Sequence, residues 1–210
     1  MAPASRASLL DRFNVSRESL APLEAYVSLL LTWQRRINLI GPSTVDRIWT
    51  RHIGDALQLL PFMRPGIQSI ADLGSGAGIP GLVLAIVTGI HVHLYESNGK
   101  KAAFLREAIR QTKAPATVHQ MRIETLRDLL SRPEVDLVLG RALAPLVQLL
   151  EYAAPFMQRG ATGLFHKGKD VDAELTAAAQ CWSLVYDKHP SMTDSQGVIL
   201  EVKEARRVPS

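Results

Sequence analysis

A glycine-rich stretch is the feature that most constrains this sequence. An apolar run from Ile67 to Asp72 leads into glycines at 74, 76, 78 and 81, and a second apolar run, Leu82 to Val87, follows. Continuous hydrophobic runs are typical of parallel strands that are covered on both faces. The stretch therefore predicts a buried strand, a tight turn and a helix. Glycines suit the turn because it needs positive φ angles and a close approach of backbone to ligand.

The turn indicates a nucleotide-type ligand without deciding which one. Residues 76–81, GAGIPG, match the dinucleotide fingerprint G-x-G-x-x-G. The longer stretch from Asp72 also resembles the first motif of S-adenosylmethionine-dependent methyltransferases, an acidic residue followed by G-x-G-x-G. A third interpretation is a turn whose glycines serve only the close packing of helix on strand. The rest of the chain has to separate these possibilities.

Composition narrows the class of protein. With 210 residues, 47% of them hydrophobic, the chain can bury one substantial core and a modest extension. No apolar stretch reaches the roughly 20 residues of a membrane span, and the N-terminus lacks a secretory signal. The single cysteine, Cys181, cannot form an intramolecular disulfide. We therefore expect a cytoplasmic protein without membrane association, and no metal site, because cysteines and histidines are not clustered.

The charge pattern favours a polyanionic partner. The net charge is +4, and the stretch from residue 35 to the glycine turn contains five arginines: Arg35, Arg36, Arg47, Arg51 and Arg64. A basic face beside a ligand turn is typical of nucleic-acid binding, although the pair Arg35 and Arg36 could equally be a solvated helix end. His52 and Asp55 have nearly i, i+3 spacing, and we expect a structural ion pair or hydrogen bond there. Arg51 would remain available to a ligand or RNA.

The first 65 residues are predicted to be helical. Ser16 is the expected N-cap of a first helix that ends near Leu39, before the breaker pair Gly41-Pro42. Ser43 is the expected cap of a second helix, closed by Pro61 and Pro65. This region, residues 1–65, is interpreted as a helical extension packed on a main domain of residues 66–210.

From Ile67 onward, short strands and helices alternate, which indicates a doubly wound, mostly parallel sheet. The expected strands are 67–72, 91–95, one within 115–121, 135–139 and 161–166, and the expected helices are 98–112, 124–130 and 145–157. Two last strands, 182–187 and 198–203, should form a closing antiparallel hairpin. Methyltransferase sheets usually end this way and dehydrogenase sheets do not, which is an analogy between folds.

Acidic residues follow two of the expected strands. Glu96 ends the second strand, about 20 residues past the turn, where a carboxylate can accept hydrogen bonds from both ribose hydroxyls. It could instead support the start of the next helix. Ile123 and Glu124 follow the third strand, and could contact an adenine, or Glu124 could favour a helix dipole. NAD and S-adenosylmethionine both contain adenosine, so these residues do not distinguish them.

Basic residues follow the next two strands. Arg141 ends the fourth strand, where a guanidinium could hold a phosphate, a guanine edge or a carboxylate. Lys167 ends the fifth strand and is interpreted as a second cation on the same rim. His166, beside it, could act as an acid or base, but a lone histidine at a strand end is more often structural.

Several short motifs occur together in the order of one family. They are Asn38-Leu39, Arg51-His52-Ile53 with Asp55, residues 72–81, Gly99-Lys100-Lys101 with Phe104-Leu105, Arg141-Ala142 and Lys167-Gly168. Over about residues 25–205, the chain resembles the bacterial 16S ribosomal RNA guanine-N7 methyltransferase G family, also called glucose-inhibited division protein B. The resemblance implies a class I S-adenosylmethionine-dependent methyltransferase fold with an N-terminal helical extension. It also implies methylation of N7 of one guanine in the decoding region of 16S rRNA.

The resemblance also implies roles for individual residues. Gly74, Ile79, Ile123, Glu124 and Arg141 would contact S-adenosylmethionine, and from the residues themselves we add Gly76, Gly78 and Glu96. Guanine N7 carries an available lone pair, so no general base is expected, and Arg141 and Lys167 would act by positioning. RNA contacts are expected from Arg35, Arg36, Arg51 and Lys167. The family often has serine, aspartate and serine where this chain has Ala56, Glu96 and Gly140.

The partner implied is 16S rRNA, within the small ribosomal subunit or its assembly intermediate, and we expect a monomer. Two other functions explain part of the sequence. An NAD-dependent oxidoreductase would account for the glycines and Glu96 but not for the helical extension or the terminal hairpin. A non-catalytic RNA-binding module would account for the basic character but not for an intact cofactor turn.

Overall fold

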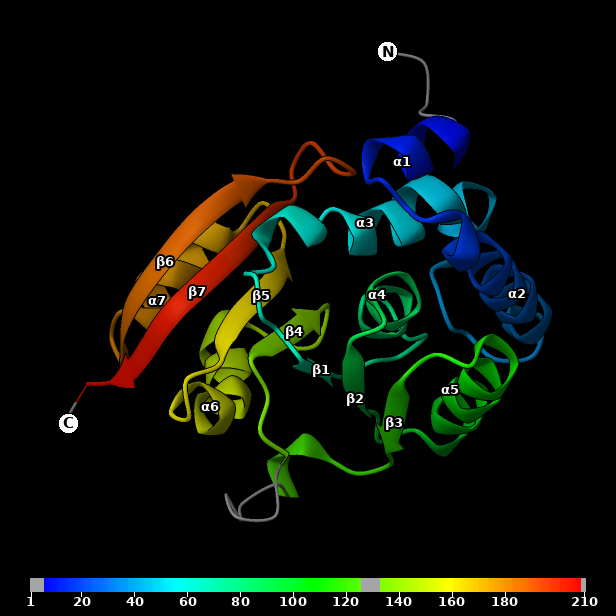
Figure 1. Cartoon of the computed structure of the whole chain (residues 1–210). Helices are drawn as coiled ribbons and strands as arrows, with labels where there is room; N and C mark the ends of the chain where they lie inside the picture. The colour runs from blue at the N-terminus through cyan, green and yellow to red at the C-terminus, as the bar shows by residue number, and fades with distance from the viewer. Residues whose placement is uncertain (1–5, 126–132, 209–210) are drawn as a thin grey trace.

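The computed structural model describes residues 6–125 and 133–208. Its centre is a seven-stranded sheet in the order β3-β2-β1-β4-β5-β7-β6 (Figure 1). The strands are β1 Ser69–Leu73, β2 His91–Tyr95, β3 Ala116–His119, β4 Leu137–Arg141, β5 Thr162–Lys167, β6 Trp182–Pro190 and β7 Val198–Arg207. The first five are parallel, and β7 runs antiparallel to both β5 and β6. The predicted parallel sheet with a closing hairpin is confirmed.

Helices cover both faces of the sheet (Figure 1). The α-helices are α1 Arg6–Arg12, α2 Arg17–Gln34, α3 Gly54–Leu57, α4 Gly81–Thr88, α5 Gly99–Thr112, α6 Leu146–Met157 and α7 Val171–Ala178. Short 3₁₀ segments span Pro42–Arg47, Leu60–Phe62 and Ile123–Thr125, and a π-helical turn spans Trp49–Ile53. One hydrophobic cluster lies on the side of α4 and α5, and a second lies on the side of α6 and α7.

The N-terminal helices share the first of these clusters with the sheet. Leu23 and Leu30 of α2 are fully buried with Phe104 of α5 and Leu82 of α4. Burying a leucine side chain stabilises a fold by roughly 1.5–3 kcal/mol. Hydrophobic packing is therefore continuous across residue 65, while the division of the chain into two domains stays a prediction.

Two predictions about helices were wrong, and one helix was missed. Helix α2 ends at Gln34 rather than near Leu39, because the Gln34 side chain accepts the N–H groups of Leu39 and Ile40 and turns the chain back. The helix expected from Ser43 is instead a succession of 3₁₀, π and short α segments. Helix α7 has no counterpart in the predicted elements. Of the helix predicted for 124–130, only the first two residues lie within the described residues.

The glycine turn combines two kinds of constraint. Gly74, Gly76 and Gly78 all have positive φ angles, between +54° and +83°. A Cβ atom at Gly78 would lie 2.8 Å from the Cβ of Leu82, and one at Gly81 would lie 2.5 Å from Oδ2 of Asp72. At Gly76 the nearest atom would be 3.8 Å away. Packing thus requires glycine at 78 and 81, whereas Gly76 borders open space.

We expect Gly81→Ala to destabilise the fold by about 1–3 kcal/mol, the usual cost of overpacking, because its methyl group would meet the buried Asp72 side chain. Urea unfolding measures the loss. Gly168→Ala is the matched control, since no atom lies within 4 Å of the added methyl group and φ is not positive. Equal stability of the two variants would contradict the packing argument.

Candidate functional site

Two adjoining pockets meet at the glycine turn. The arginine pocket has a volume of about 250 Å³ and the carboxylate pocket about 340 Å³. Gly74, Gly76, Lys101 and Ala142 line both. The arginine pocket is completed by Leu39, Ile40, Gly41, His52, Ser75, Ala77, Ile79 and Arg141. The carboxylate pocket is completed by Tyr95, Glu96, Ser97, Met121, Arg122, Ile123, Glu124, Leu143, Ala144, Gln148 and Tyr152.

Glu96 holds the turn and also faces the carboxylate pocket. Its Oε2 atom accepts the N–H of Gly76 at 2.9 Å, and its Oε1 atom accepts the N–H of Asn98 at 2.7 Å. Asn98 is the N-cap of α5. The support of the next helix that the sequence suggested is therefore present, and the carboxylate still lines the pocket where a ribose was expected.

The predicted adenine contacts, Ile123 and Glu124, lie together on the wall of the carboxylate pocket. The Glu124 carboxylate accepts the hydroxyl of Tyr152, from α6, at 3.0 Å. A backbone hydrogen bond, followed by the bond from Tyr152, lowers the pKa of Glu124. Glu124 is therefore ionised at neutral pH. Tyr152 was missed because the sequence gives no sign that this helical residue faces the third strand.

Arg141 is fixed between two residues of the N-terminal region. Its Nε atom lies 3.0 Å from Oδ2 of Asp55, and a terminal nitrogen lies 3.0 Å from Nδ1 of His52. A guanidinium can only donate, so His52 Nδ1 accepts and His52 Nε2 carries the hydrogen. Burial, followed by the charge of Arg141, lowers the pKa of His52 to about 4, which leaves a neutral imidazole. His52 and Asp55 meet through Arg141 and not by the direct pairing that their spacing suggested.

Two cations expected to contact RNA are already paired. The Lys167 side chain is only 7% exposed, its Nζ lies 2.5 Å from Oε2 of Glu174, and it also donates to the carbonyl of Ala144. Arg51 donates to Oδ2 of Asp194 at 3.0 Å. Neither side chain lines either pocket. These positions do not favour the predicted phosphate contacts, because binding a phosphate would leave a carboxylate without its partner.

The remaining predicted RNA contacts, Arg35 and Arg36, are exposed at the end of α2, outside both pockets. Within the described part of the chain neither forms an ion pair. Of the two residues, Arg35 is the C-cap of α2, where a cation favours the helix dipole. The solvated helix end and the RNA contact thus both fit this geometry.

Lys101 is a site residue that the sequence interpretation missed. It lines both pockets, is half-buried, and has no ion-pair partner in the described regions. It stands in the first turn of α5, where no acidic residue balances it. A cation at the N-terminus of a helix is unfavourable for the helix dipole. Two lysines at the start of a predicted helix, Lys100 and Lys101, could therefore have indicated a functional role from the sequence alone.

Tyr26 was also missed, because its helical spacing resembled that of ordinary core residues. This fully buried residue of α2 donates its hydroxyl to the carbonyl of Ala77, in the glycine turn, at 2.6 Å. Burial raises the pKa of Tyr26, so the hydroxyl remains a donor. The N-terminal region therefore holds the ligand turn from one side, and Glu96 holds it from the other.

Asp72 closes the N-terminal end of α4. It is 1% exposed, and its Oδ2 atom accepts the N–H of Gly81 at 3.2 Å. In a dinucleotide site the first N–H groups of this helix face a pyrophosphate. Here a buried carboxylate takes that position, and the next N–H, of Leu82, bonds to the carbonyl of Gly78. The geometry does not suit a pyrophosphate.

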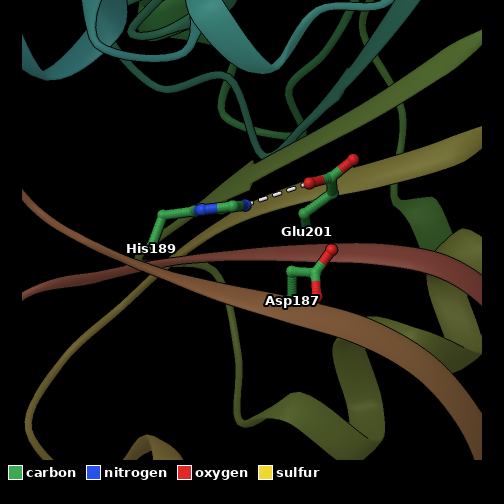
Figure 2. A group of neighbouring side chains, drawn as sticks. All are labelled: Asp187, His189 and Glu201. Atoms are coloured by element: carbon green, nitrogen blue, oxygen red, sulfur yellow. Dashed lines mark hydrogen bonds and ion pairs between the residues drawn. The ribbon is translucent and has the colours of Figure 1, made fainter.

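Among the described residues, one group brings three potential metal-ligating side chains together, on the β6–β7 hairpin and away from both pockets. Figure 2 shows Asp187, His189 and Glu201, with His189 Nε2 3.0 Å from Glu201 Oε2. Oδ2 of Asp187 forms an ion pair with Nζ of Lys203 at 2.5 Å. The hydrogen bond between His189 and Glu201 and the ion pair of Asp187 account for these side chains, so we assign no metal to them. No described helix has the length and apolar character that crossing a membrane requires.

The family is decided by sequence comparison. The family model described as rRNA small subunit methyltransferase G matches residues 19–202. The chain belongs to this family. A relative from Methylorubrum populi, named ribosomal RNA small subunit methyltransferase G, is 49% identical, over 97% of each chain. One of the same name from Paramagnetospirillum magneticum is 47% identical, over 95% of each chain.

Solved structures agree on the fold. An O-methyltransferase from Bacillus cereus in complex with SAH has a TM-score of 0.60 at 14% identity, covering 94% of this chain and 97% of the other. A ribosomal protein L11 methylase from Lactobacillus delbrueckii has a TM-score of 0.58 at 14% identity, covering 72% and 77%. With the sheet order described above, they confirm the class I methyltransferase fold that the family resemblance implied.

The stability of the fold should depend on pH through Asp72. Burial raises the pKa of Asp72 from 3.8 to about 7, so between these values the native carboxyl keeps a proton that the unfolded chain has released. Stability then falls as the pH rises through this window. As the pH rises, we expect the free energy of unfolding of the wild type to fall relative to that of Asp72→Asn. The asparagine does not titrate, and its amide oxygen can still accept the Gly81 N–H. Urea unfolding between pH 4 and 7 tests this, and parallel curves for the two proteins would contradict it.

Proposed function

We propose that this chain transfers the methyl group of S-adenosylmethionine to N7 of one guanine of 16S rRNA in the small ribosomal subunit. Membership of the rRNA small subunit methyltransferase G family supports this proposal. The observation that carries it structurally is the meeting of two pockets at one glycine turn whose helix is capped by a carboxylate. One pocket would hold a nucleoside, and the other would receive a second reactant.

The residues of the carboxylate pocket fit S-adenosylmethionine. Glu96 would accept the ribose hydroxyls, and Ile123 with Glu124 would contact the adenine. Gly76, which borders open space, would let the backbone approach the ligand. Of the other residues implied by the family resemblance, Gly74 and Ile79 line the arginine pocket. Gly78, which we added from the glycine pattern, packs against Leu82 and Leu105.

The chemistry requires alignment more than proton transfer. S-adenosylmethionine supplies a methyl group on a positively charged sulfonium. The N7 lone pair of guanine is free, so the protein needs no base, and orientation alone can contribute roughly 7–11 kcal/mol. Positive charge moves onto the base during transfer, so uncompensated cations should not lie against it. In the arginine pocket, His52 is neutral and Asp55 balances Arg141. The remaining cation, Lys101, lies where the two pockets join and would be balanced by an RNA phosphate.

We assign the RNA backbone contacts to cations that have no partner in the described residues. Lys101, between the two pockets, is the candidate for a phosphate beside the target base, with Arg35 and Arg36 further out. The paired residues Lys167 and Arg51 keep a structural role in this proposal. We also propose that the protein acts as a monomer in the cytoplasm, on the small subunit or an assembly intermediate.

Direct assays separate this function from its alternatives. S-adenosylmethionine or its demethylated product should raise the thermal midpoint, whereas NAD should not, because only a ligand of the native state stabilises it. Small subunits from cells that lack the gene should accept a labelled methyl group, and mass mapping should place it on one guanine of 16S rRNA. Stabilisation by NAD would support an oxidoreductase. RNA binding without methyl transfer would support a non-catalytic module.

Lys101→Met should weaken RNA binding and lower the slope of log affinity against log salt by about one, as expected for one lost phosphate contact. Lys113→Met is the matched control, because Lys113 is an exposed lysine at the other end of the same helix. Filter binding at several salt concentrations gives both quantities. An unchanged slope for Lys101→Met would remove this residue from the RNA interface.

A further inference from the structure

We infer that Thr193, in the loop between β6 and β7, is a positioning residue for Arg141 and thereby for the arginine pocket. The inference rests on the proposed function, since it assigns the pocket to the methyl-transfer site. Thr193 contacts neither pocket itself. Its effect would pass through Asp55, along a chain of hydrogen bonds that crosses from the C-terminal hairpin to the N-terminal region.

The hairpin loop is bound tightly to residues 51–58. Figure 1 shows the loop that joins β6 to β7 reaching α3 and the neighbouring turn. Arg51 donates to the carbonyl of Thr193 at 2.6 Å, and the N–H of Met192 donates to Oε1 of Gln58 at 2.8 Å. Gln58 is 1% exposed, and a Cβ atom at Gly54 would lie 3.3 Å from Cγ2 of Thr193. The position of the Thr193 side chain is therefore defined on several sides.

One carboxylate oxygen of Asp55 binds the hairpin loop, and the other binds Arg141. Its Oδ1 atom accepts the Thr193 hydroxyl and also the Gln58 side-chain amide, the latter at 2.7 Å. Its Oδ2 atom pairs with Nε of Arg141 at 3.0 Å. The backbone carbonyl of Asp55 accepts Nε2–H of His166 at 2.8 Å. Loss of the Thr193 hydroxyl would leave Oδ1 of Asp55 with one of these two partners, the Gln58 amide, and would loosen the orientation of the carboxylate.

Arg141 is in turn hydrogen-bonded to residues that form the wall of the arginine pocket. It donates to Nδ1 of His52, whose Nε2–H lies 2.7 Å from the Thr44 hydroxyl. The Thr44 hydroxyl in turn donates to the carbonyl of Gly41 at 2.7 Å. All three bonds have one possible direction, because a guanidinium cannot accept and a carbonyl cannot donate. Gly41, His52 and Arg141 all line the arginine pocket, so one network sets its shape.

This hydrogen-bond network is largely buried, so its side chains have less freedom to move than those of a surface ion pair. The side chains of Arg141 and Asp55 are 23% and 14% exposed, and His52 is 6% exposed. Water has little access to replace a lost partner, and bonds to ionised groups are stronger than neutral ones. A change at Thr193 should therefore move Arg141 rather than be absorbed by solvent.

The test compares Thr193→Val, which keeps the shape but loses the hydroxyl, with Thr193→Ser, which keeps the hydroxyl. We expect Thr193→Val to lower kcat about tenfold, less than the roughly hundredfold that a 1 Å misplacement can cost, with little change in KM for S-adenosylmethionine. Thr193→Ser should restore most of the rate. Ser195→Ala, which removes an exposed hydroxyl from the same loop, is the matched control and should leave the rate unchanged.

A spectroscopic measurement makes the test independent of catalysis. The ¹H–¹⁵N signal of the Arg141 Nε–H group, assigned by its loss in Arg141→Lys, should shift in Thr193→Val but not in Ser195→Ala. In the Arg141→Lys background, Thr193→Val should have no further effect on kcat. An unshifted signal, or a rate loss that Thr193→Ser does not restore, would overturn the inference. If the wild type transfers no methyl group, the proposed function fails, and the signal still tests the link from Thr193 to Arg141.

Discussion

The contact between the buried Asp72 carboxylate and the first turn of α4 is the constraint on which the rest of the structure depends. The carboxylate closes the helix end, and only a glycine at position 81 leaves room for it. This fixes the path of the turn between β1 and α4, and so the place where the two pockets meet. The Asp72 side chain thus explains why glycine is needed at position 81, the last glycine of the dinucleotide fingerprint. The same side chain occupies the place where a dinucleotide site would bind its pyrophosphate.

The N-terminal region is part of the site and more than a helical addition to it. Tyr26 holds the glycine turn, residues 39–41 form one wall of the arginine pocket, and Asp55 orients the last residue of β4. The C-terminal hairpin completes the arrangement by holding residues 51–58. Segments from both ends of the chain therefore converge on the side of the sheet where the second reactant is proposed to bind.

The sheet was predictable because its strands are short apolar runs bounded by charged or glycine-containing turns. Residues 91–95 were predicted as a strand with their observed bounds. Residues 42–62 were not, because an apolar stripe at helical spacing does not reveal a change from 3₁₀ to π geometry. The sequence placed Arg141 and Lys167 on one rim, but tertiary contacts alone separate a pocket residue from one buried against Glu174. Tyr26 and Thr193 act across more than fifty residues of chain, a distance that local patterns cannot encode.

The two bonds that Glu96 accepts have a consequence for any ligand beside it. The two oxygens of a carboxylate group offer about four lone-pair positions, and in Glu96 a backbone N–H group uses one on each oxygen. Two positions remain, and a ribose offers two vicinal hydroxyls. Sugar and protein backbone would then share a single anion without competing for it. A single glutamate that follows β2 could therefore hold the glycine turn and bind a nucleoside at the same time.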